Sequence, residues 1–524
     1  MGPSTLDLFI LTFNCAKTLI NVPVFASHLQ DALTRNATGL PDLVAFSLQE
    51  FAPLSYSFIG GYFLSPYLAR FEEALNIAAA QVAAATTTSK RPSSAGGEGE
   101  AESDSLLSTN GPQSQGQSQG QSNGGRAKPY HLIRSHNAGM TAVMVFARDP
   151  EAVRRLQVAE VGFGAADMGN KGAVGVRVAY AAGDDDGSTA EVTFVATHFA
   201  AMEWNLRRRN KNWRSIVSDL VFENPKEVIE GLEGLGSGPK GRLLDSAASQ
   251  GITPEEEEQE MLLSAEQEAA LLQHNDRLRG ISVFRPGSHL FVAGDLNYRI
   301  GAKTPPPLAA FPSLDASSPD YWPAFLGRDQ LTQEREAGRT LHGLSEAPIT
   351  FPPTYKLDVQ SGAEGAVNEA EVRRAGAGAG AGAAEVVPFT YAPHRWPSWC
   401  DRVLYLETPR SEAAKVEVLA YEPLPVVRTS DHQAVYLRAR VPVLLSSQPA
   451  ATSSAEAEAE DEDDPRVRLP VPIDVDAYGR RAAARRREVL VGWSMFLWST
   501  REGAVVIATL MLVGVGGWWA WQGV

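Results

Sequence analysis

Five short polar segments, far apart in the chain, carry side chains suited to metal-assisted hydrolysis of a phosphate ester. Their carboxylates, imidazoles and carboxamides can hold a cation, orient a water molecule and bind phosphate oxygens. The first four each follow an apolar, strand-like stretch, so we expect these polar groups to gather at the ends of sheet strands. The segments are Thr12–Asn14, Leu48–Glu50, Thr197–His198, Gly294–Asn297 and Ser430–His432.

The strongest chemical signal is the stretch Phe291–Arg299, in which a strand-like run ends in an acid and an amide two residues apart. At strand spacing Asp295 and Asn297 share a face, so Asp295 could accept a proton from a water molecule that Asn297 helps to hold. Taken alone, an Asp-x-Asn after a strand is more often an Asx turn.

The elements that must position these groups are short strands alternating with helix-like stretches. Many strands and a few helices at this length predict an α/β fold, a sandwich of two sheets with flanking helices. The strand candidates are Leu6–Phe13, Leu43–Leu48, Thr141–Ala147, Gly172–Ala179, Val192–Thr197, His289–Ala293, Arg402–Tyr405, Val416–Tyr421 and Ala434–Leu437.

Composition permits a globular enzyme, because 524 residues with 44% hydrophobic content can bury a large core. The net charge of −15 comes mainly from two acidic runs, Glu255–Glu260 and Glu456–Asp464. Without their twelve acids, 50 acidic residues face 47 basic ones. The chain has two cysteines, Cys15 and Cys400, and neither begins a C-x5-R phosphate loop. Cysteine-nucleophile phosphatase chemistry is therefore excluded, and we expect two packed thiols.

The end of the chain predicts a membrane anchor. Residues 503–524 carry no charge and are numerous enough for a helix to cross a bilayer, and three tryptophans lie near the far end. Arginines upstream favour a cytosolic position for the preceding domain. A buried core helix is the alternative. The second apolar stretch, Val489–Trp498, is too short to span and is expected at the membrane interface.

Composition also suggests domain limits. We expect one catalytic domain over residues 1–443, interrupted by flexible insertions near 83–128, 224–273 and 360–386. Residues 444–488 form an acidic and then basic linker, and residues 489–524 a membrane-associated segment with the anchor helix at about 503–524.

Several motifs resemble those of the inositol polyphosphate 5-phosphatases, of the endonuclease/exonuclease/phosphatase superfamily. Phe291–Arg299 resembles a signature of that family, and Pro397–Leu404 its P-[AS]-W-[CT]-D-R-[IV]-L box. Met168–Gly172 matches its MGNKG motif, Thr197–Ala201 its [ST]-H-L-A-A motif, and Ser430–His432 its closing SDH. The tail anchor makes the chain similar to a fungal-type phosphatidylinositol 4,5-bisphosphate 5-phosphatase.

The resemblance implies roles for the polar residues. Glu50 would hold Mg²⁺ with support from Asn14, since hard oxygen ligands suit that ion. Asp295 would orient or deprotonate the attacking water, braced by Asn297. His432, held by Asp401 and next to Asp431, would bind the scissile phosphate and stabilise the charge on its oxygens, with His198 opposite. Glu50 could equally be a surface acid, and a lone histidine at a strand end is often structural.

Substrate recognition is also implied. Asn170 and Lys171 would meet the phosphodiester that joins ring to lipid, and Arg402 is a further substrate-binding candidate. Contacts with the 4-phosphate are expected from Tyr355, Lys356 and Arg395. The chain departs from the family at Pro393, where a lysine is usual, and at Asn212-Trp213, where Asp-Tyr is usual. Grip on the 4-phosphate could therefore be redistributed, for example to His394.

Together these features predict a Mg²⁺-dependent phosphatase that removes the 5-phosphate of phosphatidylinositol 4,5-bisphosphate. The expected partner is a phosphoinositide in a cytosolic leaflet, with the endoplasmic reticulum favoured; no nucleic acid partner is expected, and protein partners are unknown. The alternatives are an enzyme for soluble inositol polyphosphates, a catalytically weak lipid-binding module, a nuclease of the same superfamily and a sphingomyelin-type phosphodiesterase.

Overall fold

Strand β1 (Thr5–Asn14) is apolar on both of its faces, and each face lies in a different core. Leu8 and Ile10 pack between two sheets, whereas Phe9 and Phe13 pack on the other side, under helices. Successive side chains of a strand point in opposite directions, so β1 must lie inside a sheet that is covered on both sides. The computed structural model describes residues 5–89, 128–181, 189–233, 276–359, 387–407, 415–443 and 464–523.

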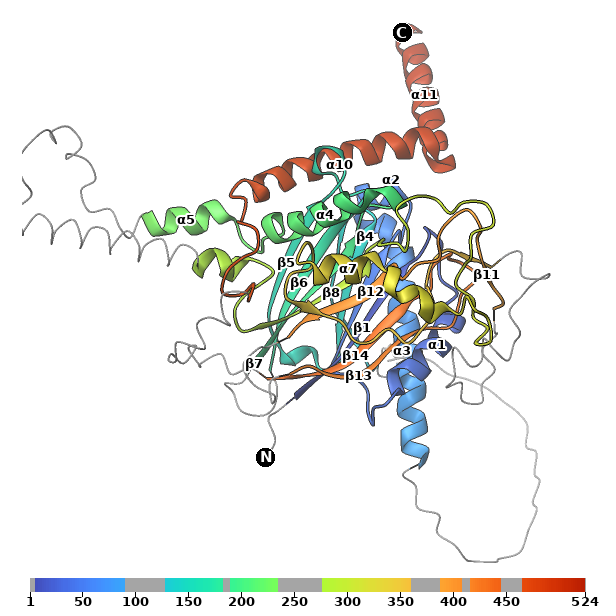
Figure 1. Ribbon diagram of the computed structural model, residues 1–524. Coiled ribbons are helices and arrows are strands. Elements are labelled where there is room, and N and C mark those ends of the chain that lie inside the picture. The colour runs from blue at the N-terminus through green and yellow to red at the C-terminus, as the bar shows by residue number, and fades with distance from the viewer. Residues whose placement is uncertain are drawn as a thin grey trace, which may run out of the picture.

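The described residues form two six-stranded mixed sheets that lie face to face (Figure 1). The first sheet has the order β13 (Glu417–Pro423), β14 (Val435–Pro442), β1, β2 (Leu43–Gln49), β4 (Thr141–Ala147), β3 (His131–Ala138). The second has the order β5 (Val153–Gly162), β6 (Gly172–Ala181), β7 (Thr189–His198), β8 (Ser288–Asp295), β12 (Asp401–Leu406), β9 (Leu344–Ser345). A separate pair consists of β10 (Leu357–Asp358) and β11 (Thr390–Tyr391).

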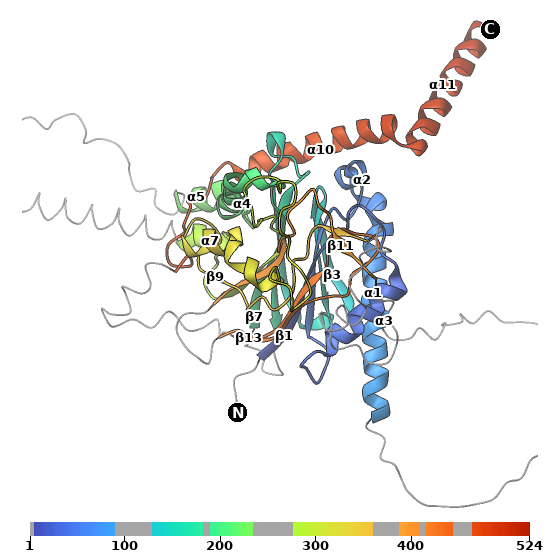
Figure 2. The same cartoon turned by 45° about the vertical axis from the view of Figure 1, so that its right-hand side comes forward.

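Helices cover the outer faces of the sandwich, as the view in Figure 2 shows. The first sheet is covered by α1 (Val22–Thr34) and α3 (Ser65–Ser89), and the second by α4 (Leu206–Asp219) and α7 (Gln330–Glu336). Shorter helical segments complete the connections: α2 (Leu54–Ile59), η1 (Gly61–Leu64), η2 (Pro150–Ala152), η3 (Ala165–Asp167), η4 (Glu203–Asn205), α5 (Pro225–Glu233) and η5 (Trp322–Arg328). The predicted two-sheet α/β sandwich with flanking helices is confirmed.

All nine predicted strands are present, with end shifts of a few residues. Two long strands, β3 and β5, were not predicted from the sequence. β3 (His131–Ala138) buries only Ala138, and β5 (Val153–Gly162) exposes Arg154 and Arg155, so neither has the apolar run that marks the inner strands. Edge strands are specified by pairing to a neighbour more than by their own composition.

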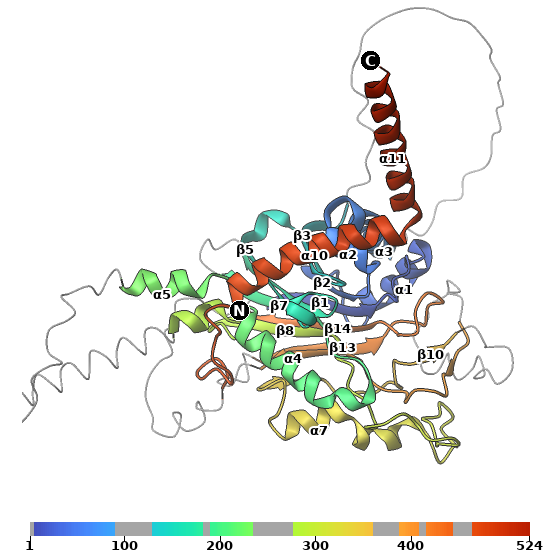
Figure 3. The same cartoon turned by 90° about the horizontal axis from the view of Figure 1, so that it is seen from above.

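The C-terminal part differs from the expected linker. Helix α10 (Ala477–Ser499) lies across one end of the sandwich, and α11 (Arg501–Gln522) projects away from it (Figures 1 and 3). The basic part of the predicted linker at 444–488 thus includes the first half of α10, which is bound to the domain by ion pairs such as Arg481 with Glu160. The apolar stretch Val489–Trp498 is the second half of α10, and its Phe496 packs on Tyr56 and Phe63.

Two predicted insertions begin later than expected, because α3 runs to Ser89 and α5 covers Pro225–Glu233. The remainder of these insertions, residues 360–386 and the acidic segment at 444–463 lie outside the described residues. In the described part of the chain, α11 is the helix long and apolar enough to cross a membrane, and it is almost entirely uncovered by the domain.

Candidate active site

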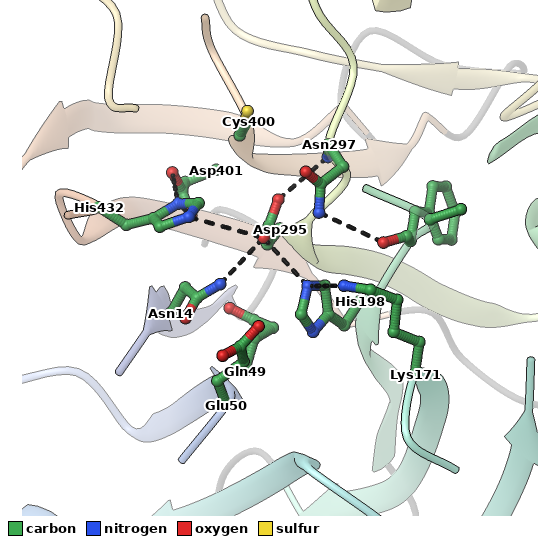
Figure 4. A network of polar contacts seen from close by, with 12 residues as sticks. Asn14, Gln49, Glu50, Lys171, His198, Asp295, Asn297, Cys400, Asp401 and His432 are labelled. Carbon is green, nitrogen blue, oxygen red and sulfur yellow. Dashed lines mark hydrogen bonds and ion pairs between the residues drawn. The ribbon is translucent and has the colours of Figure 1, made fainter. Parts of the chain in front are cut away.

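Strand register brings acidic and imidazole side chains to one end of the sandwich. Asp295, the last residue of β8, lies opposite His198 on β7 and opposite Asp401 on β12. Asn14 ends β1 in the facing sheet. Figure 4 shows Asn14, His198 and His432 pointing toward the Asp295 carboxylate. Side chains from four of the five polar segments therefore meet around one buried carboxylate.

The carboxylate of Asp295 is only 1% exposed and is surrounded by donors. Its Oδ2 accepts a hydrogen bond from Asn14 Nδ2 at 3.0 Å and lies 3.1 Å from His198 Nε2 and 3.9 Å from His432 Nε2. Burial alone would raise the pKa of Asp295, but the imidazoles of His432 and His198 hold it well below its usual range. Asp295 is therefore ionised at any pH at which the protein would work.

His432 forms a buried pair with Asp401, since its Nδ1 lies 3.0 Å from Asp401 Oδ2. Thr354 donates a hydrogen bond to the same carboxylate oxygen at 2.7 Å. Burial alone would lower the pKa of His432, but the carboxylates of Asp401 and Asp295 raise it to about 9. The Tyr355 ring packs on the imidazole at a centroid distance of 4.5 Å. His432 is therefore an oriented cation at neutral pH.

His198 is the opposite case. Burial and the nearby Lys171 ammonium lower the pKa of His198, although Asp295 opposes the shift. Lys171 Nζ contacts His198 Nε2 directly. Burial lowers the pKa of Lys171 to about 8, with Asp295 and Glu50 opposing the shift. The two imidazoles beside Asp295 thus differ in charge, with His432 protonated and His198 neutral.

Asn297 braces the site through a network that includes Arg299, a residue to which the sequence assigned no role. Asn297 has a left-handed backbone with φ of 56°, and its N–H donates to Asp295 Oδ1 at 3.1 Å. Its side-chain nitrogen donates to the Phe199 carbonyl, and its Oδ1 accepts from Arg299. The Arg299 guanidinium lies over the Tyr355 ring at 4.2 Å. The backbone N–H of Asn297 therefore fixes Asp295, and the side-chain amide is held by Phe199 and Arg299.

Asn14 and Glu50 are the predicted metal ligands. Asn14 is the last residue of β1, and Glu50 follows the last residue of β2, the neighbouring parallel strand. Glu50 Oε2 lies 2.9 Å from Lys17 Nζ. Burial opposes the shift, but His198 and Lys17 lower the pKa of Glu50, which is therefore ionised. Asn14 Oδ1 accepts a hydrogen bond from Ala16 N at 3.1 Å. Carboxylate and amide oxygens are the donors that Mg²⁺ prefers, so these residues fit such an ion.

Another group of possible ligands consists of Asp295, Asp401 and His432, whose donor atoms lie within 4.8 Å of one another. A metal requires a neutral imidazole, whereas His432 has a raised pKa and its Nδ1 is bonded to Asp401. This group suits an anion at His432 better than a cation. The oxygen donors near Glu50 are the better cation site.

Two of the predicted substrate-binding residues, Lys356 and Arg395, are partly exposed and each is paired with an acid. Lys356 contacts the Asp431 carboxylate, and Arg395 lies 2.8 Å from the buried Glu203. Burial opposes the shift, but His432 and Lys356 lower the pKa of Asp431. Asp431 therefore positions Lys356, rather than standing among the groups around Asp295.

Arg402 does not belong to the substrate-binding set, which corrects the expectation from sequence. It is fully buried, and its guanidinium is bonded to Glu346 at 2.6 Å and to Asp329 at 3.0 Å. Tyr421 donates a further hydrogen bond to Glu346 at 2.8 Å. Arg402 thus neutralises two buried acids and connects β12 to the segments that carry Asp329 and Glu346.

Two departures from the family pattern have structural roles. Asn212 accepts a hydrogen bond from Ala200 N at 3.0 Å, and Trp213 lies in the core with its Nε1 bonded to His342. Asn212 also lines a cavity of about 220 Å³ together with Asn170 and Lys171. The exposed Pro393 and His394 have no contact that identifies a role. Cys15 and Cys400 are buried free thiols, as expected.

Comparison with curated proteins gives partial matches. The chain is 27% identical over 296 residues to type I inositol polyphosphate 5-phosphatase 13 of Arabidopsis thaliana, which covers 53% of this chain and 20% of that protein. It is 25% identical over 313 residues to inositol-1,4,5-trisphosphate 5-phosphatase 1 of Schizosaccharomyces pombe, which covers 59% of this chain and 19% of that protein. The match thus spans about a fifth of these relatives.

Among solved structures, one similar chain is the inositol polyphosphate 5-phosphatase domain of SpSynaptojanin in complex with inositol (1,4)-bisphosphate and calcium ion. It has 18% identity and a TM-score of 0.47, and the alignment covers 92% of this chain and 93% of that one. The model of endonuclease/exonuclease/phosphatase family 2 matches residues 121–438, which is more than half of the chain. The chain belongs to endonuclease/exonuclease/phosphatase family 2 and has inositol polyphosphate 5-phosphatases among its relatives.

Proposed function

We propose that this chain is a Mg²⁺-dependent phosphatase that removes the 5-phosphate of phosphatidylinositol 4,5-bisphosphate. The observation that carries the proposal is the buried Asp295 carboxylate between a cationic and a neutral imidazole. Relatives named as inositol polyphosphate 5-phosphatases support the class of substrate. The 4,5-bisphosphate lipid is our own choice within that class.

Asp295 would orient the attacking water. A carboxylate with a strongly lowered pKa is a weak base, so accepting a hydrogen bond from water fits Asp295 better than full proton removal. Asn297 holds one Asp295 oxygen through its backbone N–H, and Asn14 and His198 hold the other. The water would therefore meet the phosphorus from a fixed direction.

His432 would bind an oxygen of the scissile phosphate through Nε2, because its Nδ1 is occupied by Asp401. Lys171 lies on the other side of Asp295, next to His198, and would bind a second oxygen. A magnesium ion near Glu50 and Asn14 would supply further neutralisation of charge on the phosphate. Asp401 and Thr354 would hold the imidazole in place during the reaction.

Substrate specificity would come from groups around this centre. Asn170 and Lys171 line the cavity of about 220 Å³ and would meet the phosphodiester of the lipid. Lys356, beside Tyr355, and Arg395 carry the positive charge proposed to bind the 4-phosphate. Asp431 and Glu203 hold these two cations in position.

We also propose that α11 spans a membrane and that the catalytic domain lies on the cytosolic side, with the endoplasmic reticulum favoured. The helix is apolar, is of spanning length and is left uncovered by the domain. Anchoring would raise the local concentration of lipid substrate over that of soluble inositol phosphates.

Phosphate release from liposomes tests the activity. We expect the full chain to hydrolyse phosphatidylinositol 4,5-bisphosphate faster than the 3,4,5-trisphosphate lipid or soluble inositol 1,4,5-trisphosphate. Asp295→Asn should lower turnover by roughly 10²- to 10⁴-fold, whereas Asp315→Asn, at an exposed loop position, should not. Preference for the soluble compound would favour the alternative substrate, and lipid binding without turnover would favour a binding module.

Magnesium titration tests the role of Glu50. Replacing the carboxylate in Glu50→Gln removes an anionic oxygen ligand, so the Mg²⁺ concentration for half-maximal rate should rise by about tenfold or more. Glu151→Gln, at an exposed position, is the matched control. An unchanged magnesium requirement in Glu50→Gln would remove Glu50 from the metal site.

The pH profile tests the charge of His432. A histidine whose pKa is raised in the folded state keeps its proton until the pH approaches about 9. The stability that the proton contributes is complete below the unfolded pKa of about 6.5 and is lost as pH rises through about 9. We therefore expect kcat/KM of the full chain to fall in two steps, near pH 8 as Lys171 loses its proton and again above about pH 9 as His432 does. In Asp401→Asn the His432 step should begin at lower pH, because the carboxylate that raises the pKa is gone. Identical alkaline limbs would contradict this assignment.

Flotation with liposomes tests the membrane proposal. The full chain should float with the vesicles, and a chain that ends at Ser499, which keeps α10 but lacks α11, should stay in the aqueous fraction. Both should hydrolyse a short-chain, water-soluble phosphatidylinositol 4,5-bisphosphate at similar rates. Flotation of the shortened chain to the same extent would show that α11 is not the anchor.

A further inference from the structure

Helix α10 holds a loop that carries two of the proposed substrate-binding residues. The loop, Phe163–Lys171, joins β5 to β6 and is here called the 163–171 loop. Two successive residues of this loop that are not glycine, Ala166 and Asp167, have positive backbone φ angles of 53° and 60°. Such left-handed backbone persists only where surrounding contacts hold it.

Those contacts come from α10. Arg487 donates to the Ala166 carbonyl at 3.4 Å, and Arg481 donates to the Asp167 carbonyl at 3.1 Å. Both left-handed residues of the 163–171 loop therefore have their carbonyl groups bound by arginines from a helix more than 300 positions later in the chain. The loop conformation depends on α10 at the two places where it is least favourable by itself.

Glu488 of α10 makes the contact closest to the substrate-binding residues. Its Oε1 accepts a hydrogen bond from Gly169 N at 2.7 Å, and the next two residues along the chain are Asn170 and Lys171. Gly169 is confined on its other side, because a Cβ on Gly139 would lie 1.7 Å from the Gly169 carbonyl oxygen. The N–H of Gly169 is thus held by Glu488 and its carbonyl lies against Gly139. Together they fix the backbone direction from which Asn170 and Lys171 continue.

The Glu488 side chain is fully buried in an ion network that fixes its position. Arg481 pairs with Glu488 and lies 2.9 Å from Glu160 on β5, and Arg485 pairs with Glu488 at 3.1 Å while donating to the Phe58 carbonyl. Burial opposes the shift, but Glu488 and Glu160 raise the pKa of Arg481. Removing one partner of a buried network leaves a charge unpaired, so these contacts form as a unit.

The other end of α10 leads directly into α11. Gly492 packs so closely on α2 that a Cβ there would lie 2.8 Å from Phe58 Cβ, and Phe496 lies among Tyr56 and Phe63. Figures 1 and 3 show α10 lying along the domain up to the point where α11 projects. One packed helix therefore connects the proposed membrane span to the 163–171 loop.

We propose that Glu488 is a positioning residue for Asn170 and Lys171, so that the helix leading into the membrane span completes the substrate-binding site instead of only tethering the domain. This inference rests on the proposed function. It predicts that a change in α10 alters turnover of a substrate that needs no membrane.

Kinetics in detergent test the proposal with the full chain and water-soluble, short-chain phosphatidylinositol 4,5-bisphosphate. Glu488→Ala should lower kcat/KM by about tenfold or more, because Asn170 and Lys171 lose their position. Glu488→Gln keeps an acceptor for Gly169 N and should recover most of that loss. Arg486→Ala, at an exposed position on the same helix, should match the unaltered chain. Equal kcat/KM in all four proteins would overturn the proposal.

Hydrogen exchange gives a readout that does not require activity. In Glu488→Ala the Gly169 amide should exchange about tenfold faster than in the unaltered chain, while strands β7 and β8 keep their protection. If Glu488→Ala fails to fold, Arg481→Lys replaces it, since a lysine carries its donors on one atom and cannot reproduce the bidentate pairing of the guanidinium with Glu488. Unchanged exchange in the folded variant refutes the coupling. An inactive unaltered chain with faster loop exchange in the variant refutes the proposed function alone.

Discussion

The structure depends on keeping one carboxylate charged while it is shut away from water. Asp295 is almost completely buried, and an isolated ion in that position would cost several kcal/mol. Two imidazoles, an amide and a lysine around it offset that cost. Each of these groups lies at the end of a strand or on a loop beside one. The strand register therefore also determines which side chains surround Asp295.

The charged neighbours of the two buried histidines give them different roles. His432 has two acids beside it and carries a proton, whereas His198 has a lysine beside it and does not. Residue type alone could not distinguish them, because both lie in short polar motifs beside strands. The distinction arises from Asp401 and Lys171, which come from other strands and loops and are placed by the tertiary fold.

The inner strands and the polar groups at their ends could be predicted from sequence, because a strand buried on both faces has a continuous apolar run and the residue that follows it is conspicuous. The role of Arg402 could not, since a buried arginine and a phosphate-binding arginine look alike until Glu346 and Asp329 are placed. The docking of α10 was hidden for a similar reason. Its arginines resemble a membrane-proximal basic run, and their partners Glu160 and Asp167 lie some three hundred residues earlier.

The pairing of β1 with β2 and of β7 with β8 in parallel gives the sandwich two unlike poles. One pole holds the ends of those strands, with Asn14 and Asp295. At the other pole the end of β6 at Ala181 pairs with the start of β7 at Thr189, and the start of β1 at Thr5 pairs with the end of β14 at Pro442. Asn14 and Gln49 reach the first pole together, as do His198 and Asp295, so a slip of one residue in either parallel pairing would turn a polar end residue to the opposite face of its sheet.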